Sequence, residues 1–295
     1  MHGARTAGLF GFSHFAGGFA GGQAEYVRIP FADVNLLEIP DDVPDEKALY
    51  LSDVLCTSFN CVKDTAVYEG DTVAIFGAGP IGQMAGVFAL DEGAKKIIFV
   101  DTAPRTEEIL TRFSPAQVSK IETLDFKIAD SSKGGVVKCL KEMANDGRGP
   151  DVALDCAAGE YAKSWAHKIE IALGAETDTS EIINEMIEGV RNYGRCGVTG
   201  VYLGYANHFA VGSLMQRGIR LIGNGQAPVL KYWEHLMGKI RSGELDPLQM
   251  VSHRVRLEDL EEVYHRFDRH EDGIQKVFVE TKFSLPPVGP ALTRF

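Results

Sequence analysis

Short apolar runs alternate with helix-like stretches from Thr72 onward. Six runs have the length and residue types of buried strands, and they are Thr72–Phe76, Lys96–Val100, Phe126–Ala129, Asp151–Ala157, Arg195–Val201 and Ile219–Gly223. Helices are predicted between them at Ile81–Leu90, Pro104–Phe113, Gly135–Asn145 and Glu181–Asn192. This alternation favours a parallel sheet covered on both faces, so we predict an α/β, doubly wound fold of about six strands.

The flanking parts of the chain have a different pattern. Ala24–Ile39 is rich in β-forming residues, and Glu46–Asn60 has the pattern of a helix that leads into the sheet. On the other side of the sheet we predict a helix at Pro228–Arg241, followed by a final helix and strand. The three prolines of the tail Leu285–Phe295 favour disorder.

Composition narrows the class of protein. The chain has 295 residues, of which 45% are hydrophobic, and its 30 basic and 41 acidic residues give a net charge of −11. This charge argues against nucleic acid and against an anionic membrane as partners. The five cysteines form no C-x-x-C pair and favour free thiols in a reducing compartment. No apolar run approaches the roughly 20 residues that span a bilayer, and we expect a cytoplasmic protein.

A glycine-rich turn, Gly77-Ala78-Gly79-Pro80-Ile81-Gly82, follows the first predicted strand. In a dinucleotide-binding turn the first glycine permits the tight bend, the second lets a pyrophosphate approach bare backbone, and the third lets the helix pack on its strand. The phosphates then lie at the positive end of that helix. Strand, turn, helix, second strand and a terminal Asp101 occur here in the required order, which favours a Rossmann sheet over the alternative, an ordinary glycine turn.

Asp101 and Arg105 bear on which dinucleotide binds. A carboxylate at the end of the second strand accepts hydrogen bonds from the adenosine ribose and repels a 2′-phosphate, so Asp101 favours NAD over NADP. The alternative is a surface Asp that begins a turn before Pro104. Arg105 either stacks on the adenine ring or is a solvated arginine of a first helical turn.

Further segments accompany the glycine turn. They are Gly21-Gly22-Gln23-Ala24-Glu25-Tyr26-Val27, Leu51-Ser52-Asp53, Gly225-Gln226-Ala227-Pro228-Val229, Asp246-Pro247 and Ser252-His253-Arg254. Together they resemble the zinc-dependent medium-chain alcohol dehydrogenases, most closely the glutathione-independent formaldehyde dehydrogenase branch, from about Gly11 to Thr281. The resemblance implies an NAD-dependent oxidoreductase that transfers a hydride between a small alcohol or aldehyde and NAD.

The resemblance also implies a division of the chain. Residues 1–52 would be part of a β-rich catalytic domain, residues 53–225 the NAD-binding domain, residues 226–284 a return to the catalytic domain, and residues 285–295 a disordered tail. Enzymes of this branch hold catalytic zinc with a Cys and a His of the N-terminal lobe and with an Asp just before the cofactor domain. Asp53 matches this third ligand. The segments with the other ligands precede Met1 in the family, so we expect an N-terminally truncated sequence in which Asp53 alone does not hold zinc.

Other residues could supply metal ligands. Cys56 and Cys61 lie near Asp53, but we interpret both as small buried hydrophobic residues. Three histidines lie near loops or glycine-rich segments and are interpreted as structural, namely His14, His208 and His253.

The resemblance assigns a wall of the cofactor site residue by residue. Pro80 and Ile81 would flank the pyrophosphate, and Ala157 would lie near the adenosine. The residues that would border the nicotinamide are Thr199, Val201, Gly225, Gln226 and Ala227. Lys276 matches a basic residue for the pyrophosphate, although a solvated charge explains it equally well. The insertion Gly159–Ser180 matches a loop over the cofactor but differs in sequence.

Three functions are compatible with these residues. The first is an incomplete or inactive zinc-type dehydrogenase. The second is an NAD(H)-binding module or redox sensor without turnover. The third is a zinc-independent reductase, which the missing lobe disfavours because that lobe would form one wall of a substrate cleft. The resemblance also implies a homodimer or homotetramer that pairs through the edge strand Arg220–Gly223.

Overall fold

A computed structural model describes residues 8–12, 14, 17–102, 105–144, 146–157, 178–202, 204–269, 271–284 and 293. The chain divides into two compact units. One unit is Tyr50–Met250, and the other combines Met1–Leu49 with Val251–Phe295. The predicted tail at 285–295, apart from residue 293, and nearly all of the predicted insertion at 159–180 lie outside the described residues.

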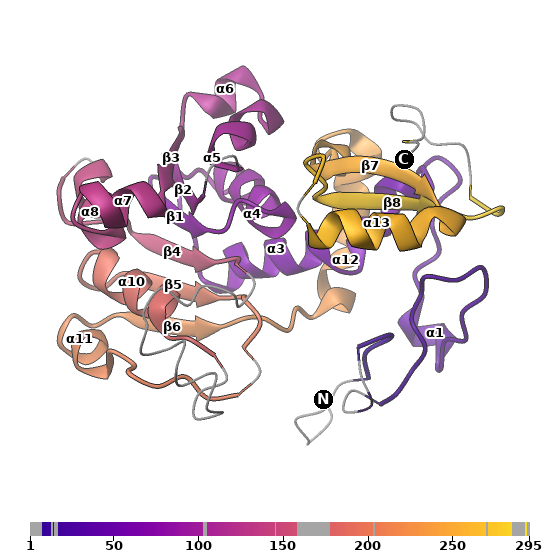
Figure 1. Cartoon of the computed structure of the whole chain (residues 1–295), viewed down its shortest axis with the longest axis horizontal. Helices are drawn as coiled ribbons and strands as arrows, with labels where there is room; N and C mark the ends of the chain where they lie inside the picture. Colours follow the sequence, from indigo (N-terminus) through magenta and orange to yellow (C-terminus); the bar gives the residue numbers. More distant parts are fainter. Residues whose placement is uncertain are drawn as a thin grey trace. The chain divides into compact units, whose positions relative to one another are not determined.

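The unit Tyr50–Met250 contains a six-stranded parallel sheet (Figure 1). Its strands are β1 (Thr72–Phe76), β2 (Lys96–Asp101), β3 (Ile121–Asp125), β4 (Val152–Asp155), β5 (Arg195–Val198) and β6 (Arg220–Gly223). They are ordered β3-β2-β1-β4-β5-β6, so β1 pairs with β2 on one side and with β4 on the other. The chain therefore changes direction of winding between β1 and β4, where doubly wound sheets open a crevice at the carboxyl ends of their strands.

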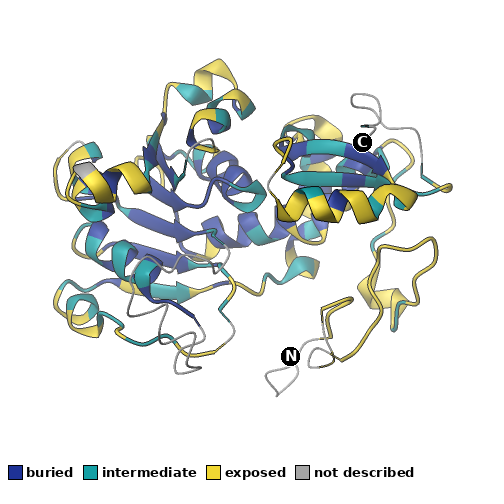
Figure 2. Cartoon of the chain, viewed as in Figure 1, coloured by how far each residue is buried: buried dark blue, intermediate teal, exposed yellow. Residues whose placement is uncertain are grey.

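Helices cover both faces of this sheet (Figure 1). One face packs against α8 (Val136–Met143) and α10 (Glu181–Gly189), which contact each other. The other face is covered by α3 (Val54–Asp64) and α4 (Pro80–Asp91), and α12 (Val229–Ser242) packs against α3. All five residues of β1 are buried, as a strand covered on both sides requires (Figure 2). Burial of each large apolar side chain of this core contributes about 1.5–3 kcal/mol.

The predicted fold class and number of strands are confirmed, but the third strand was placed wrongly. Residues 126–129 are helical and belong to α7 (Phe126–Ser132), while β3 occupies Ile121–Asp125. Asp125 explains the difference because its carboxylate accepts hydrogen bonds from the amides of Lys127, at 2.8 Å, and Ile128, at 3.2 Å. This side chain caps the helix and ends the strand in one step.

Other predicted elements are interrupted. The helix predicted at 104–113 is α5 (Arg105–Glu108) followed by a 3₁₀ turn, Ile109–Arg112, and Pro104 lies outside the described residues. A short helix, α6 (Pro115–Val118), precedes β3, and α11 (Val211–Gln216) precedes β6. The helix predicted at 46–60 is α2 (Asp45–Ala48), a 3₁₀ turn and then α3, with a break at Ser52–Asp53.

The unit formed by the two ends of the chain contains a parallel pair of strands, β7 (Val251–Arg256) and β8 (Lys276–Glu280), with α13 (Leu260–Asp268) between them in sequence. A buried ion pair between Glu46 and Arg254 joins the N-terminal and C-terminal segments. The segment 24–39, although rich in β-forming residues, contains no strand; its one regular element is α1 (Ala32–Asn35), and it is largely exposed (Figure 2). A strand needs a neighbour for its amide and carbonyl groups.

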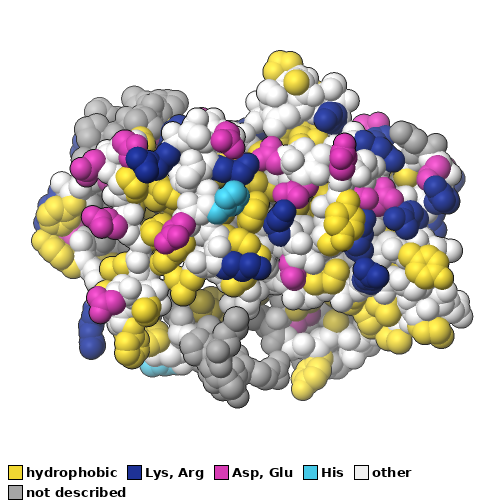
Figure 3. Space-filling model, turned by 180° about the vertical axis from the view of Figure 1, so that it is seen from behind, with side chains coloured by type: hydrophobic (Ala, Val, Ile, Leu, Met, Phe, Trp, Pro, Cys, Tyr) yellow, Lys and Arg dark blue, Asp and Glu magenta, His cyan; other side chains and the backbone are white. Residues whose placement is uncertain are grey.

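Two surface properties bear on partners. Among the described residues, no helix combines the length and apolar character needed to cross a membrane. Acidic and basic side chains are interspersed over the face seen in Figure 3. On this face the Lys and Arg side chains are scattered among acidic ones and do not form a continuous basic surface.

Candidate functional site

The turn between β1 and α4 lies where the strand order reverses. Gly77 has a φ of +100°, and a Cβ atom on it would lie 2.8 Å from the carbonyl oxygen of Cys156, just after β4. A Cβ atom on Gly82 would overlap the carbonyl oxygen of Gly77. At Gly79 the nearest described atom would be Nη1 of Arg105, at 3.7 Å. The first and third glycines are therefore required by packing, whereas the second leaves the backbone open to a ligand.

Helix α4 presents its positive end beside this turn. Gly79 is the N-cap residue, Pro80 is the first helical residue, and no side chain caps this end. The amide of Gln83 bonds to the carbonyl oxygen of Gly79 at 2.9 Å, so it is the amides of Ile81 and Gly82 that face outward. The helix has 12 residues, and its dipole favours an anion at this end. The turn and helix thus fit a pyrophosphate.

Asp101 joins the end of β2 to the glycine turn. Its Oδ2 accepts a hydrogen bond from the amide of Ala78 at 2.7 Å, and its Oδ1 accepts one from the amide of Thr102 at 2.7 Å. The guanidinium of Arg105 lies 3.7 Å from Oδ2 and is 44% exposed. Each carboxylate oxygen can accept a second hydrogen bond. The carboxylate is therefore held in place and still able to receive ribose hydroxyl groups.

Asp155, the last residue of β4, is a buried carboxylate that the sequence pattern did not single out. Its side chain accepts hydrogen bonds from the hydroxyl of Tyr202 at 2.8 Å and from the amide of Ala157 at 3.1 Å. Burial raises the pKa of Asp155 to about 6, although these two hydrogen bonds oppose the rise. The signal in the sequence that could have identified Asp155 is a charged residue at the end of a buried apolar strand. Asp155 links the loops after β4 and β5 at the crevice.

The remaining predicted cofactor residues follow β4, β5 and β6 at the same edge of the sheet. Thr199 is buried, Val201 and Gln226 are exposed, and Ala157 and Ala227 are half-buried. Because the strands are parallel, their carboxyl ends lie on the same edge as the glycine turn. Lys276 is the first residue of β8 in the other unit, and its role stays a prediction.

The residues near Asp53 do not fit a zinc site. Asp53 is the exposed N-cap residue of α3, and its Oδ1 accepts a hydrogen bond from the hydroxyl of Thr57 at 3.3 Å. Burial and the nearby charge of Asp53 raise the pKa of the Cys56 thiol to about 12. Cys61 is fully buried. Among the described residues, no group of three His, Cys, Asp or Glu side chains could hold a metal.

The three histidines occupy different settings. His14 lies in an exposed turn, and His208 is exposed with a φ of +56°. His253 lies in β7, where partial burial lowers the pKa of its imidazole.

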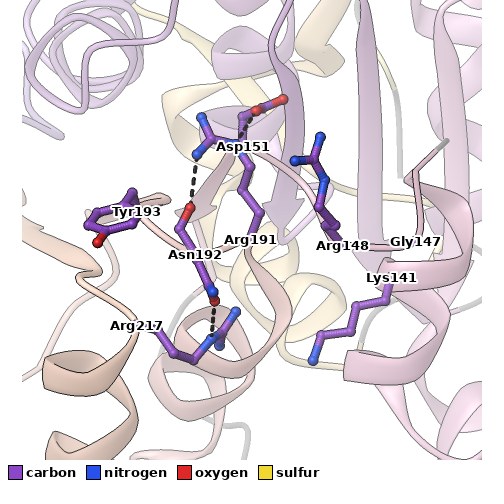
Figure 4. Close-up of a pocket in the computed structure, with 8 residues that line it drawn as sticks. All are labelled: Lys141, Gly147, Arg148, Asp151, Arg191, Asn192, Tyr193 and Arg217. Carbon is purple, nitrogen blue, oxygen red and sulfur yellow. Dashed lines mark hydrogen bonds and ion pairs between the residues drawn. The ribbon is translucent and has the colours of Figure 1, made fainter.

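A basic cavity of about 780 Å³ lies in the same unit, at the amino-terminal ends of β4 and β5 (Figure 4). Arg191 pairs with Asp151 at 2.5 Å, and Arg217 donates to the carbonyl oxygens of Ile187 and Val190 at the end of α10. Lys141 lies in the last turn of α8. Arg217 therefore caps the carboxyl end of α10, and the charge of Arg191 is offset by Asp151, so these two cations serve the packing of this unit.

The fold and the glycine turn define a dinucleotide-binding domain of the Rossmann class. Comparison with known proteins is more specific, although no family model matches the chain. A zinc-type alcohol dehydrogenase-like protein of Schizosaccharomyces pombe is 35% identical over 280 residues, which are 95% of this chain and 63% of that protein. A glutathione-independent formaldehyde dehydrogenase of Pseudomonas aeruginosa is 30% identical, over 94% of this chain and 68% of that enzyme.

A solved structure, the alcohol dehydrogenase TADH from Thermus sp. ATN1, is 29% identical with a TM-score of 0.71. The match covers 93% of this chain and 70% of that one. The chain thus spans about two thirds of the length of these relatives. It belongs to the zinc-type alcohol dehydrogenase family, as its resemblance to that family predicted.

Proposed function

We propose that this chain binds NAD(H) across the carboxyl edge of its six-stranded sheet. The amides of Ile81 and Gly82 receive the pyrophosphate, and Gly79 allows it to approach the backbone. Asp101 accepts the ribose hydroxyls and disfavours a 2′-phosphate, which selects NAD over NADP. Arg105 lies beside the adenosine. Thr199, Val201 and the segment Gly225–Ala227 border the nicotinamide.

The observation that carries this proposal is the combination of Gly79 and the end of α4. A Cβ atom on Gly79 would have no described atom closer than 3.7 Å, and this glycine is the uncapped start of a 12-residue helix. Open backbone at a positive helix end is the arrangement that binds phosphate groups. The carboxylate of Asp101 bonds to the amide of Ala78 beside that end, which supports its proposed role as acceptor for the ribose hydroxyls.

The activity we propose is that of the family, hydride transfer between a small alcohol or aldehyde and NAD. The nicotinamide, when bound, accepts or releases the hydride. The residues of this chain hold and orient the cofactor at the edge of the sheet. Because the described residues do not fit a zinc site, no step of this proposal passes through zinc.

A second candidate is NAD(H) binding without turnover, as a sensor or interaction module. It is favoured because, among the described residues, no group of three His, Cys, Asp or Glu side chains could hold a metal ion. The two candidates share the cofactor site and differ in metal content and turnover.

One set of measurements separates these possibilities. NADH fluorescence titration is expected to show binding by the wild type, and Asp101→Asn is expected to weaken it about tenfold, or about 1.4 kcal/mol. NADPH is expected to bind more weakly than NADH to the wild type, with a smaller difference in Asp101→Asn. Elemental analysis for zinc, together with NADH production from small alcohols and formaldehyde, then distinguishes dehydrogenase from binder. Lack of NADH binding would contradict both candidates.

Location and assembly complete the proposal. All five cysteines are free thiols, which fits the reducing cytoplasm.

We infer a homodimer or homotetramer that pairs through β6, because β6 is an edge of the sheet. The small substrate is an alcohol or aldehyde, as the names of the relatives suggest.

A further inference from the structure

A buried polar network lies at the start of the loop that follows β6. Asn224 comes directly after β6 and is 4% exposed. Its side-chain oxygen accepts a hydrogen bond from the hydroxyl of Thr199 at 2.6 Å. Its side-chain amide donates to the hydroxyl of Thr65 at 2.9 Å and to the carbonyl oxygen of Cys61 at 3.4 Å. One side chain thus ties the ends of β5 and β6 to α3.

A second asparagine, Asn60, bonds to residues on either side of this loop. Asn60 of α3 donates to the carbonyl oxygen of Asn224 at 3.2 Å and accepts a hydrogen bond from the hydroxyl of Tyr232 at 3.2 Å. Tyr232 belongs to α12, and both Asn60 and Tyr232 are buried. The segment between Asn224 and α12 is therefore anchored to α3 at both of its ends.

The surrounding packing is shaped around the network. A Cβ atom on Gly197 would overlap the hydroxyl of Thr65, so a glycine in the middle of β5 makes room for that group. The amide of Asn224 bonds to the carbonyl oxygen of Val198 at 3.0 Å, which extends the pairing of β6 with β5 by one residue. A Cβ atom on Gly225 would lie 3.3 Å from the carbonyl oxygen of Thr199, so the two loops lie in close contact.

We propose that Asn224 is a positioning residue, which fixes the loop Gly225–Ala227 against Thr199 so that the loop can receive the nicotinamide half of NAD(H). This role rests on the proposed NAD(H) binding. A buried amide is costly unless it is hydrogen-bonded, and an apolar residue of similar size would fill the space without setting the direction of the loop. Asn224 acts through its neighbours, because it bonds to Thr199 and precedes Gly225, and both of these residues are assigned to the nicotinamide.

Two ligands separate positioning from general stability. ADP-ribose shares the adenosine, pyrophosphate and ribose of NADH but lacks the nicotinamide. Asn224→Ala and Thr65→Val each remove one side of the same hydrogen bond, and Thr65→Ser is the matched control that keeps the hydroxyl. We expect the Kd for NADH to rise about tenfold in Asn224→Ala and several-fold in Thr65→Val, while ADP-ribose affinity changes less than about twofold. Thr65→Ser is expected to stay close to the wild type for both ligands.

Hydrogen exchange gives a readout that needs no ligand. Amides of residues 225–227 are expected to exchange faster in Asn224→Ala and Thr65→Val, with β1 and α4 unchanged. Equal losses of NADH and ADP-ribose affinity, or unchanged NADH affinity and exchange, would overturn the positioning role. If the variants overturn the positioning role in this way but the wild type binds both ADP-ribose and NADH, the proposed function is left intact. A wild type that binds neither ligand would overturn both. If Asn224→Ala does not fold, Thr65→Val with its serine control decides.

Discussion

At the scale of single residues, the three glycines of the turn after β1 are required for different physical reasons. Gly77 adopts a positive φ and lies against Cys156, and Gly82 lies against the carbonyl oxygen of Gly77. Gly79 is not crowded by the protein. The sequence spacing identifies all three positions, but only the contacts separate a glycine needed for folding from one needed for a ligand.

Alanine substitutions are expected to separate these roles. Gly82→Ala forces a backbone shift and is expected to lower the free energy of unfolding by about 1–3 kcal/mol. Gly79→Ala is expected to leave stability within about 0.5 kcal/mol of the wild type. It should nevertheless weaken NADH binding roughly tenfold, because the new methyl group occupies the path of the pyrophosphate. Urea unfolding and NADH titration measure the two effects, and equal stability losses in both variants would contradict the distinction.

Asp155 predicts a dependence of stability on pH. Its pKa is raised from 3.8 to about 6 in the folded protein, so the folded state keeps this proton at a pH where the unfolded chain has lost it. The stabilisation from this group is fully present below about pH 4 and is lost as the pH rises through 6. A shift of about two units corresponds to about 3 kcal/mol. Asp155→Asn is therefore expected to gain stability relative to the wild type by up to this amount between pH 4 and pH 7.

Asp151→Asn is the matched comparison, because the pKa of Asp151 is shifted in the opposite direction to that of Asp155. Burial raises the pKa of Asp151, but hydrogen bonds from Arg191 and from the amide of Thr72 outweigh burial and lower it overall. The wild type should therefore lose its advantage over Asp151→Asn as the pH falls. Denaturant unfolding between pH 2 and pH 8 measures both differences, because the Asp151 contribution is lost only as the pH falls below about 3.8. Parallel pH profiles for Asp155→Asn and the wild type would contradict a raised pKa at Asp155.

At the scale of elements, local sequence signals predicted whether a segment is a helix or a strand better than they predicted the residues at which it begins and ends. The helices α4, α8, α10 and α12 lie where the sequence predicts helices. The third strand was displaced because Phe126–Ala129 is as apolar as a strand, and the signal for its helix is the cap by Asp125. An aspartate cap can thus override apolar patterning, but only the contacts show it, because β2 and β4 also end in Asp without a helix beginning there.

The edge strand β6 leads to a prediction about assembly. The amides of Arg220 and Asn224 bond to β5, so the alternation along the strand directs the amide of Gly223 away from the sheet. A Cβ atom on Gly223 would meet open space. Gly223→Pro is therefore expected to remove an outward amide and abolish pairing through this edge, whereas Gly223→Ala keeps both the amide and the assembly. Light scattering after gel filtration measures the mass, and equal masses for all three proteins would exclude this interface.

At the scale of the whole molecule, the residues of the proposed cofactor site all belong to one compact unit, Tyr50–Met250. The other unit brings the two ends of the chain together through the Glu46–Arg254 ion pair. The predicted division of the chain into domains at residues 52, 225 and 284 stays a prediction. The helix α12 belongs to the sheet-containing unit, where it contacts α3.

This division predicts that cofactor binding does not need the second unit. Residues 50–250 expressed alone are expected to bind NADH within about threefold of the affinity of the full chain, since every contact named in the proposed function lies within them and only the candidate Lys276 lies outside. Fluorescence titration of both proteins measures this ratio, with circular dichroism to verify folding of the fragment. A folded fragment that does not bind NADH would place an essential contact in the other unit.

The sequence by itself determined the α/β class, the six strands and the glycine turn, because these depend on residues that are near neighbours along the chain. Only the tertiary structure decided the partners of buried polar groups. Asp155 meets Tyr202, and Asn60 meets Asn224 across 164 positions of sequence. No local pattern encodes such pairs, because their energy depends on burial and on the direction of hydrogen bonds after the strands are ordered.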